Sequence, residues 1–308
     1  MAAPVLTTRA WFELLLLSAI WGGSFLAIRT ALDEIPFVTS VAWRVGLAAL
    51  VLWAVVVVRN LSVPHDPRVW GALLVMGLLN NVLPFGLMAW GQLFIETGLT
   101  SILNAATAIF GVLVAALLLP DERLTPKRAV GVALGFAGVV TAIGPGALLD
   151  VDPRSLAQLA VLAGTVSYAF AGVWARTRLS GLSPVVSAAG MLTGSSLVAI
   201  PAALWIDGAV WPRQPDTWAA VAYYAVIATA FAYLLYFRIL RVAGSGNLML
   251  CTLLVAPVAI VLGAWARDEA LGANAFAGFA LLALGLIVLD GRAWARLTAW
   301  ARPASGRG

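Results

Sequence analysis

The stretch Asp121–Gly138, DERLTPKRAVGVALGFAG, returns about 147 residues later as Asp268–Gly285, DEALGANAFAGFALLALG. An acidic pair opens both stretches, and a glycine, a leucine and a second glycine keep the same offset behind it. Earlier in the chain, Arg29-Thr30 returns at this spacing as Arg176-Thr177. A repeat at a fixed period indicates that the chain consists of two copies of one structural unit.

The composition indicates that both copies lie in a membrane. The 308 residues are 62% hydrophobic and only 11% charged, and the mean hydropathy is +0.97, which is far from the range of soluble domains. The lone Cys251 and the lone His65 exclude a disulfide framework and leave too few ligands for zinc, haem or an iron-sulfur cluster, so no metal or cofactor is expected. The net charge of +5 is distributed as small groups of cations between apolar runs, so we expect a lipid bilayer and a small-molecule substrate as partners, and no nucleic acid.

A membrane-spanning helix needs about 20 mostly apolar residues, and runs of that length are too long for the strands of an outer-membrane barrel. Such runs lie near residues 10–31, 37–58, 69–91, 97–119, 127–146, 155–176, 183–206, 217–238, 244–266 and 271–290. We read the first run as a helix that stays in the protein and not as a cleaved signal peptide. The expected fold class is an all-α polytopic membrane protein with ten transmembrane helices, five per copy.

The distribution of cations predicts the orientation. Arg44 lies within a span, Arg29, Arg154, Arg213 and Arg267 lie at the outer ends, and the remaining fourteen Arg and Lys residues lie at the cytoplasmic ends if both termini are inside. Because five is an odd number, the second copy then crosses the membrane inverted, which is the architecture of alternating-access transporters. The expected units are a first repeat (1–146), an inverted second repeat (147–291) and a cytoplasmic amphipathic tail (292–308).

Several residues carry a resemblance to a known family. Trp21–Phe25 in the first helix, Pro36 leading to Arg44 in the second, and Asp121-Glu122 before a fifth helix with Gly131 near its start resemble the EamA-type drug/metabolite transporter superfamily. The resemblance covers residues 11–290, and the doubled ten-helix layout is its most specific part.

In the second copy, Tyr168 stands at the position equivalent to Trp21 and Met191 at the position equivalent to Arg44, so that copy departs from the pattern. The resemblance implies carriage of metabolites across the inner membrane, often the export of amino acids. It also implies a central cavity lined by helices one, three, four, six, eight and nine.

Polar residues within the apolar runs are the first candidates for substrate binding, because a polar group facing lipid is costly. Asn80 and Asn81 lie near the middle of the third helix, with Pro84 just beyond, and Asn104 lies within the fourth. These residues are suited to hydrogen-bonding a zwitterion. The alternative is that the asparagines link helices or satisfy carbonyl groups that Pro84 leaves free.

Aromatic residues are the second group of substrate-binding candidates. Trp21 and Tyr168 occupy equivalent mid-depth positions on helices one and six, so an inverted repeat would place them on opposite sides of one site, where they suit an apolar or aromatic side chain. Packing in the core is the alternative for both. Tyr233 and Tyr236 on helix eight and Trp90 on helix three are further candidates.

Three arginines are candidates for structural or gating roles. Arg44 lies about 10 Å inside its span if the helix starts near residue 36. It has three possible roles: to bind a substrate carboxylate, to extend toward Asp33 or Glu34, or to act as a structural strut. We favour the strut, because the family has an arginine here whatever the substrate. Arg29 and Arg176 end their helices on opposite sides of the membrane. This position is compatible with a gate or with an interfacial anchor.

The absence of certain residues narrows the function. No Asp or Glu lies at mid-depth, which disfavours carboxylate-based proton coupling, and there is no phosphate-binding loop for ATP. Lys127 is the only lysine and lies in a loop, so a phosphorylated sugar is a poor substrate. We therefore expect export of small neutral or zwitterionic metabolites, amino acids first, by facilitated transport or exchange. The alternative is a multidrug or quaternary-cation exporter driven by an ion gradient; an intramembrane enzyme and a membrane scaffold fit less well, and no catalytic residue is expected.

The fifth helix carries Gly131, Gly135 and Gly138, a spacing that permits close contact between helix backbones. We expect these glycines to pack inside their own copy, with a homodimer contact as the alternative. The chain is therefore expected to be a monomer or a homodimer.

Overall fold

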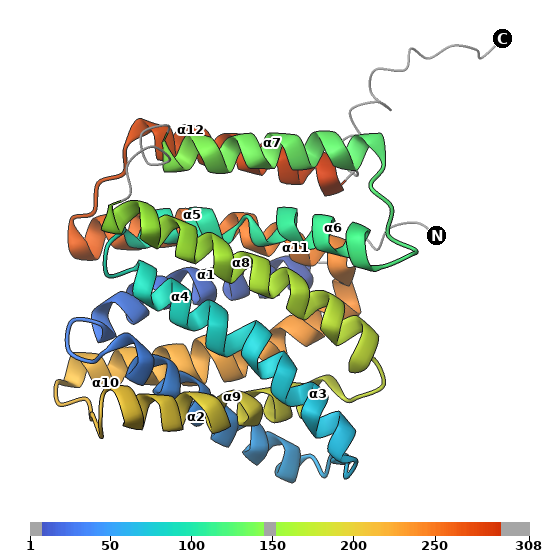
Figure 1. The fold of residues 1–308 in the computed structure, drawn as a ribbon, viewed down its shortest axis with the longest axis vertical. Coiled ribbons are helices and arrows are strands. Elements are labelled where there is room, and N and C mark those ends of the chain that lie inside the picture. The colour runs from blue at the N-terminus through green and yellow to red at the C-terminus, as the bar shows by residue number, and fades with distance from the viewer. Residues whose placement is uncertain (1–7, 145–151, 291–308) are drawn as a thin grey trace.

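The computed structural model describes residues 8–144 and 152–290, and every regular element in these ranges is a helix (Figure 1). The first part contains α1 (Thr8–Ala31), α2 (Phe37–Val58), α3 (Pro67–Gly77), the π-helix η1 (Leu78–Val82), α4 (Leu83–Gly91), α5 (Thr97–Asn104), α6 (Thr107–Leu118) and α7 (Pro126–Ile143). The second part contains α8 (Pro153–Arg178), α9 (Pro184–Ile206), α10 (Pro215–Ala222), the π-helix η3 (Tyr223–Phe231), α11 (Ala232–Arg267) and α12 (Ala273–Asp290). The predicted tail (292–308) and residues 145–151 of the joint between the copies lie outside the described residues.

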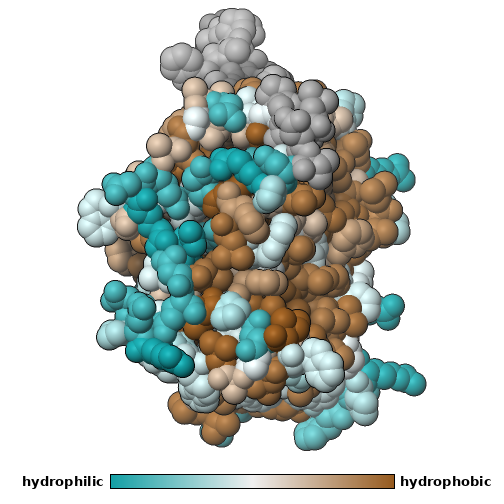
Figure 2. Space-filling model, turned by 60° about the vertical axis from the view of Figure 1, so that its left-hand side comes forward, coloured by the Kyte–Doolittle hydropathy of each residue, from teal (hydrophilic) through white to brown (hydrophobic). Residues whose placement is uncertain are grey.

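The predicted fold class is confirmed as an all-helical, polytopic membrane protein. Within the described ranges, eight helical segments are long and apolar enough to cross a membrane, and two shorter apolar helices, Leu254–Arg267 and Ala273–Leu289, follow them. Hydrophobic residues cover a broad area of the face in Figure 2, and hydrophilic residues gather mainly along its left side. Trp205 is 90% exposed and Leu117 81% exposed, as expected for side chains that face lipid. The count of ten spans stays a prediction.

The eighth and ninth predicted spans are joined, because α11 is helical across the expected loop near residue 240. The run from η3 through α11 nevertheless does not extend straight. The indole nitrogen of Trp21 donates to the carbonyl of Ala228, and the neighbouring Gly22 lies directly against Val258. A straight helix would separate these two contacts, about 30 residues apart, by about 45 Å. The chain must therefore turn between them, so that two limbs flank α1.

α7 and α12 form an antiparallel pair along one side of the molecule (Figure 1). A Cβ added to Gly138 would lie 2.7 Å from the carbonyl oxygen of Gly278, and one added to Gly131 would lie 2.9 Å from that of Gly285. At the 147-residue spacing, Gly131 is equivalent to Gly278 and Gly138 is equivalent to Gly285. Gly138 thus contacts the equivalent of Gly131, and Gly131 contacts the equivalent of Gly138, as a two-fold relation between the copies would produce. The expectation that the glycines pack inside their own copy is wrong for Gly131 and Gly138, whose close packing joins one copy to the other within one chain, whereas Gly135 faces Ile109 of its own copy.

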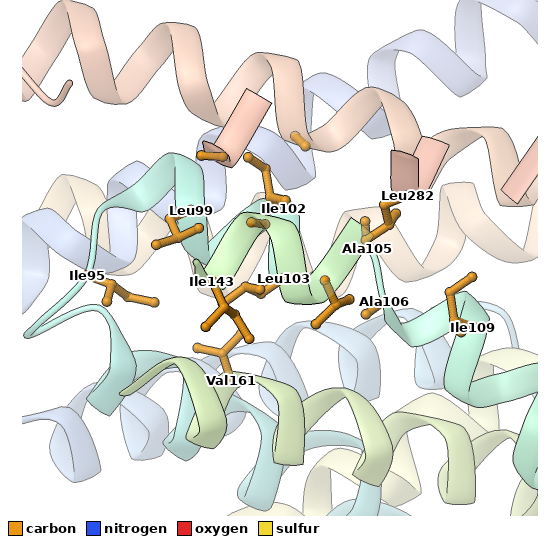
Figure 3. Packing of buried hydrophobic residues seen from close by; sticks show 14 of the residues in the cluster. Ile95, Leu99, Ile102, Leu103, Ala105, Ala106, Ile109, Ile143, Val161 and Leu282 are labelled. Carbon is orange, nitrogen blue, oxygen red and sulfur yellow. The ribbon is translucent and has the colours of Figure 1, made fainter. Parts of the chain in front are cut away.

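The predicted fourth span (97–119) is divided at Ala105 and Ala106 into α5 and α6. The hydrogen bonds there shorten to three-residue steps, as in the bond from the Ala106 N–H to the Leu103 carbonyl, and the Thr107 hydroxyl donates to the Asn104 carbonyl. Such side-chain bonds to the backbone compete with a regular helix. α5 itself is central, since its residues from Thr97 to Leu103 are all buried. Leu99, Ile102 and Leu103 belong to the buried apolar cluster shown with Ile143 and Val161 in Figure 3.

Candidate functional site

Two π-helical segments occupy equivalent positions in the two copies. η1 contains Asn80 and Asn81, and adding 147 residues places it within η3. π-helical turns are rare and are frequent at functional sites. In η1 the cause is visible: Pro84 has no N–H to bond the Leu79 carbonyl, and the hydroxyl of Ser167 on α8 donates to that carbonyl at 2.7 Å instead. Pro84 thus frees a carbonyl as predicted, but a serine and not an asparagine satisfies it.

The two asparagines join three helical segments through two hydroxyls, those of Tyr233 and Ser195. Asn80 Nδ2 donates to the Tyr233 hydroxyl at 3.1 Å, and that hydroxyl donates to Asn81 Oδ1 at 3.1 Å. Asn81 Nδ2 donates to the Ser195 hydroxyl on α9 at 2.9 Å. Asn81 is completely buried and its amide is occupied by these contacts, whereas Asn80 is half-buried. Asn81 therefore links helices, and Asn80 remains accessible.

Arg44 lies beside this network. It is only 9% exposed; its Nε donates to the Thr229 hydroxyl in η3 at 3.0 Å, and its guanidinium carbon lies 3.7 Å from the ring centre of Phe85. Tyr168 and Tyr233 pack against the buried cluster that contains Phe85, the ring on which Arg44 lies. The structure thus brings together Arg44, Asn80 and two of the predicted tyrosines from four separate segments of the fold.

Arg44 has no carboxylate partner within the described residues. Asp33 instead pairs with Arg267 at 2.7 Å and, at 3.4 Å, with Arg29. Glu34 accepts hydrogen bonds from backbone N–H groups at the start of α10, beginning with that of Arg213. In the described part of the chain, the terminal nitrogens of Arg44 and the hydroxyl of Tyr168 form no hydrogen bond. A buried cation with open donors is costly unless a ligand or water completes it.

Trp21 contacts Tyr236 and not Tyr168. The ring centres of Trp21 and Tyr236 lie 5.9 Å apart, those of Tyr236 and Phe237 lie 5.3 Å apart, and those of Phe237 and Tyr233 lie 6.4 Å apart. These rings form a continuous aromatic path from Trp21 to the Asn80 network. Tyr236 thus lies in the path, whereas Tyr168 lies at the arginine end of the site.

Two predicted site residues lie outside these contacts. Asn104 ends α5, and its Oδ1 is buried without a hydrogen-bond partner. Trp90 packs against the buried cluster around α5, with its ring 5.2 Å from that of Phe94. Neither forms a hydrogen bond with Arg44 or Asn80 in the described structure.

The two arginines at the helix ends form exposed ion pairs. Arg29 contacts Asp33 one turn ahead, while Arg176 contacts Asp121 and Glu122 in the loop before α7. The acidic pair that opens the repeated stretch therefore forms ion pairs with Arg176 in the last turn of α8. These contacts are compatible with anchoring and with gating.

Several residues of the site were not identified from the sequence, among them Thr229, Ser195, Ser167, Phe85 and Phe237. Thr229 and Ser195 are hydroxyl residues inside apolar runs, a signal that was available, whereas nothing in the sequence marks Phe85. A hollow of about 580 Å³ between α2 and α9 contains none of the predicted site residues. Among the described residues, no three His, Cys, Asp or Glu side chains come together as a metal site requires.

Comparison with known proteins identifies the family of the chain. A family model described as the EamA-like transporter family matches residues 9–144 and again 155–289. The chain is 20% identical to the Bacillus subtilis protein named "uncharacterized transporter YoaV" over 87% of this chain and 92% of that one. It is 23% identical to protein PagO of Salmonella typhimurium over 89% and 90%, and 24% identical to the Escherichia coli "uncharacterized inner membrane transporter YedA" over 87% and 85%.

A solved crystal structure with 21% sequence identity has the same fold, with a TM-score of 0.68 over 94% of this chain and 99% of that one. The family and its relatives point to a non-enzymatic, transporting role. With matches that together cover most of its length, this multi-pass membrane protein belongs to the EamA-like transporter family, within the drug/metabolite transporter superfamily.

Proposed function

We propose that this transporter exports small neutral or zwitterionic metabolites, in particular amino acids with hydrophobic or aromatic side chains, across the inner membrane. In this proposal ten spans form two inverted repeats, residues 1–146 and 147–291, with both termini in the cytoplasm. The site between the repeats then opens to each side in turn.

Arg44 carries the proposal. It is buried, it has no carboxylate partner among the described residues, and it keeps its terminal nitrogens open. A substrate carboxylate is the ligand that best completes such a cation, because a guanidinium donates two parallel hydrogen bonds to it. The sequence favoured a strut for this residue, and the bond to Thr229 is compatible with that role as well. One nitrogen then fixes the side chain while the other two bind substrate.

The remaining groups suit the other parts of an amino acid. The open hydroxyl of Tyr168 and the accessible amide of Asn80 offer acceptors for an ammonium group. The aromatic path from Tyr233 through Tyr236 to Trp21 offers a surface for an apolar or aromatic side chain. Pro84 shapes the backbone beside this site, while Asn104 and Trp90 are proposed as more distant contacts.

The proposed mode is facilitated transport or exchange. Glu13, the acid nearest the membrane interior in α1, is bound by Arg9 and Arg238 at 3.0 and 3.1 Å. This acid is held near the start of α1 by two arginines and is not part of the site, which disfavours a carboxylate there as the carrier of a coupled proton.

Export of quaternary cations driven by an ion gradient is the second candidate. The aromatic path suits such ligands, because cations bind to aromatic faces. The charge of Arg44 opposes them: at about 6 Å and an effective dielectric constant of about 20, the repulsion is about 3 kcal/mol. We therefore place this candidate second.

Ligands that differ in one charged group test the proposal. Three compounds are compared as inhibitors of amino-acid transport in proteoliposomes. They are phenylalanine, phenethylamine, which lacks the carboxylate, and 3-phenylpropionate, which lacks the ammonium. We expect phenylalanine to inhibit most strongly and phenethylamine to be weaker by about 10- to 150-fold, the loss of one charge-assisted contact. Stronger inhibition by phenethylamine, or by lipophilic cations, would support the cation exporter instead.

A further inference from the structure

A second hollow lies far from the central site, where α3 begins and α8 ends. Its volume is about 410 Å³, and its lining includes Gly71, Val75 and Trp174. Arg68 and Arg178 also line it, and we call them its rim because both are exposed and lie at the ends of their helices. Both helices are parts of candidate spans, Pro67–Gly91 and Pro153–Arg178, and the hollow lies at the ends of these spans. It therefore lies at the level where lipid headgroups meet the protein.

The two arginines come from different helices and face one space. Neither side chain pairs with a carboxylate in the described part of the chain. Asp66, the nearest acid in sequence, accepts a hydrogen bond from the backbone N–H of Arg68 and thereby caps α3. Two guanidinium groups without carboxylate partners on one rim are suited to a phosphate group, with which arginine forms paired hydrogen bonds.

The aromatic ring beside the arginines is fixed in place. Trp174 Nε1 donates to the carbonyl of Ala72 on α3 at 2.9 Å, and the guanidinium carbon of Arg178 lies 5.5 Å from the ring centre. The indole thus holds one arginine at the rim and closes one side of the hollow. Such a tryptophan at the membrane interface contacts headgroup and acyl chain at once.

The hollow has an apolar interior below its charged rim. Ala72 and Val75, a turn further into the span, continue it toward the hydrocarbon layer. A soluble phosphate would use only the rim, whereas a phospholipid would place its phosphate between the arginines and a chain against the apolar part. We propose that this hollow is a binding site for an anionic phospholipid, with Arg68 and Arg178 as ligands of its phosphate.

Two kinds of variant separate the charge of the site from its shape. The double variant Arg68→Gln/Arg178→Gln removes the cations, and Arg59→Gln, an exposed arginine at the end of α2, is its control. Gly71→Phe fills the hollow and keeps both cations, since a Cβ on Gly71 meets no atom within 4 Å. Gly172→Phe is the matched control, because Gly172 on α8 is equally open and does not line the hollow.

Binding of phosphatidylglycerol and phosphatidylcholine to the purified full chain is measured by native mass spectrometry, with the shift in melting temperature as a second readout. Each arginine near a phosphate contributes about fivefold in affinity, so the double variant should bind phosphatidylglycerol about 30-fold more weakly. Gly71→Phe should lose the preference of the wild type for phosphatidylglycerol over phosphatidylcholine, and both controls, Arg59→Gln and Gly172→Phe, should keep it.

Three results would overturn the proposal. One is equal binding of the two lipids by the wild type, and another is unchanged binding in Gly71→Phe and the double variant. The third is stabilisation by inorganic phosphate as large as that by phosphatidylglycerol, which would assign the rim to a soluble anion.

Discussion

Replacement of Arg44 by methionine distinguishes a substrate ligand from a strut. The methionine keeps much of the side-chain volume but removes the charge, the bond to Thr229 and the stacking on Phe85. The lost hydrogen bond contributes about 1.5–3 kcal/mol, since one partner is charged, and the stacking about 1–2 kcal/mol. Against these losses, a buried cation without a carboxylate carries a desolvation cost of several kcal/mol, which the substitution removes.

The terms nearly cancel, so we expect the melting temperature of Arg44→Met to remain close to that of the wild type or to rise. Substrate binding should nevertheless weaken by about 10- to 150-fold, the equivalent of one lost charge-assisted contact. The assays are thermal unfolding of the purified protein and substrate binding in the same detergent. Arg59→Met, at an exposed helix end, is the matched control.

A strut would give the opposite pattern. In that case Arg44→Met would unfold at a clearly lower temperature, and the remaining folded protein would bind substrate with unchanged affinity. That outcome would refute the assignment of the terminal nitrogens to a substrate carboxylate.

Three further substitutions test the packing, the hydrogen-bond network and a helix cap. Gly138→Val should separate α7 from α12 and lower the free energy of unfolding by about 1–3 kcal/mol, whereas Gly111→Val, with open space around its Cβ, should lower it little. Equal melting temperatures of these two variants would contradict the close contact. Asn81→Leu should lower stability by about 1–3 kcal/mol, because it removes the two hydrogen bonds by which the buried amide links Tyr233 and Ser195, and a melting curve like that of the wild type would show that the links are dispensable. The hydrogen bond from the Ser155 N–H lowers the pKa of Asp152. The stability that this cap adds is therefore present above about pH 4 and is lost as the pH falls through the lowered pKa. A difference in stability between the wild type and Asp152→Ala that persists at lower pH would contradict this.

Most of the helices could be predicted from the sequence, because apolar length alone decides which segments cross a bilayer. The observed α2 (Phe37–Val58) has the predicted limits, and several other helices end within a few residues of them. The π-helices and the division of the fourth span could not be predicted in this way. They depend on contacts such as that of Ser167 with the Leu79 carbonyl, which join residues far apart in the chain.

The candidate site was partly predictable for a similar reason. Asparagines within an apolar run, such as Asn80 and Asn81, are visible as exceptions, and the structure joins both to Tyr233. The pairing of Trp21 with Tyr236 was not predicted, because equivalence between repeats relates positions and does not require that the two residues touch. The role of Phe85 beneath Arg44 was invisible, since one phenylalanine in an apolar helix resembles any other.

Counterflow of labelled neutral and aromatic amino acids, in proteoliposomes without an ion gradient, tests the central claim most directly. Trp21→Ala removes one end of the aromatic path, and Trp205→Ala, at a lipid-facing position that is 90% exposed, is the matched control. We expect label to accumulate with the wild type and the control, and little or none to accumulate with Trp21→Ala. Absence of accumulation with every amino acid in the wild type, or equal accumulation with both variants, would contradict an uncoupled amino-acid carrier with its site between the repeats.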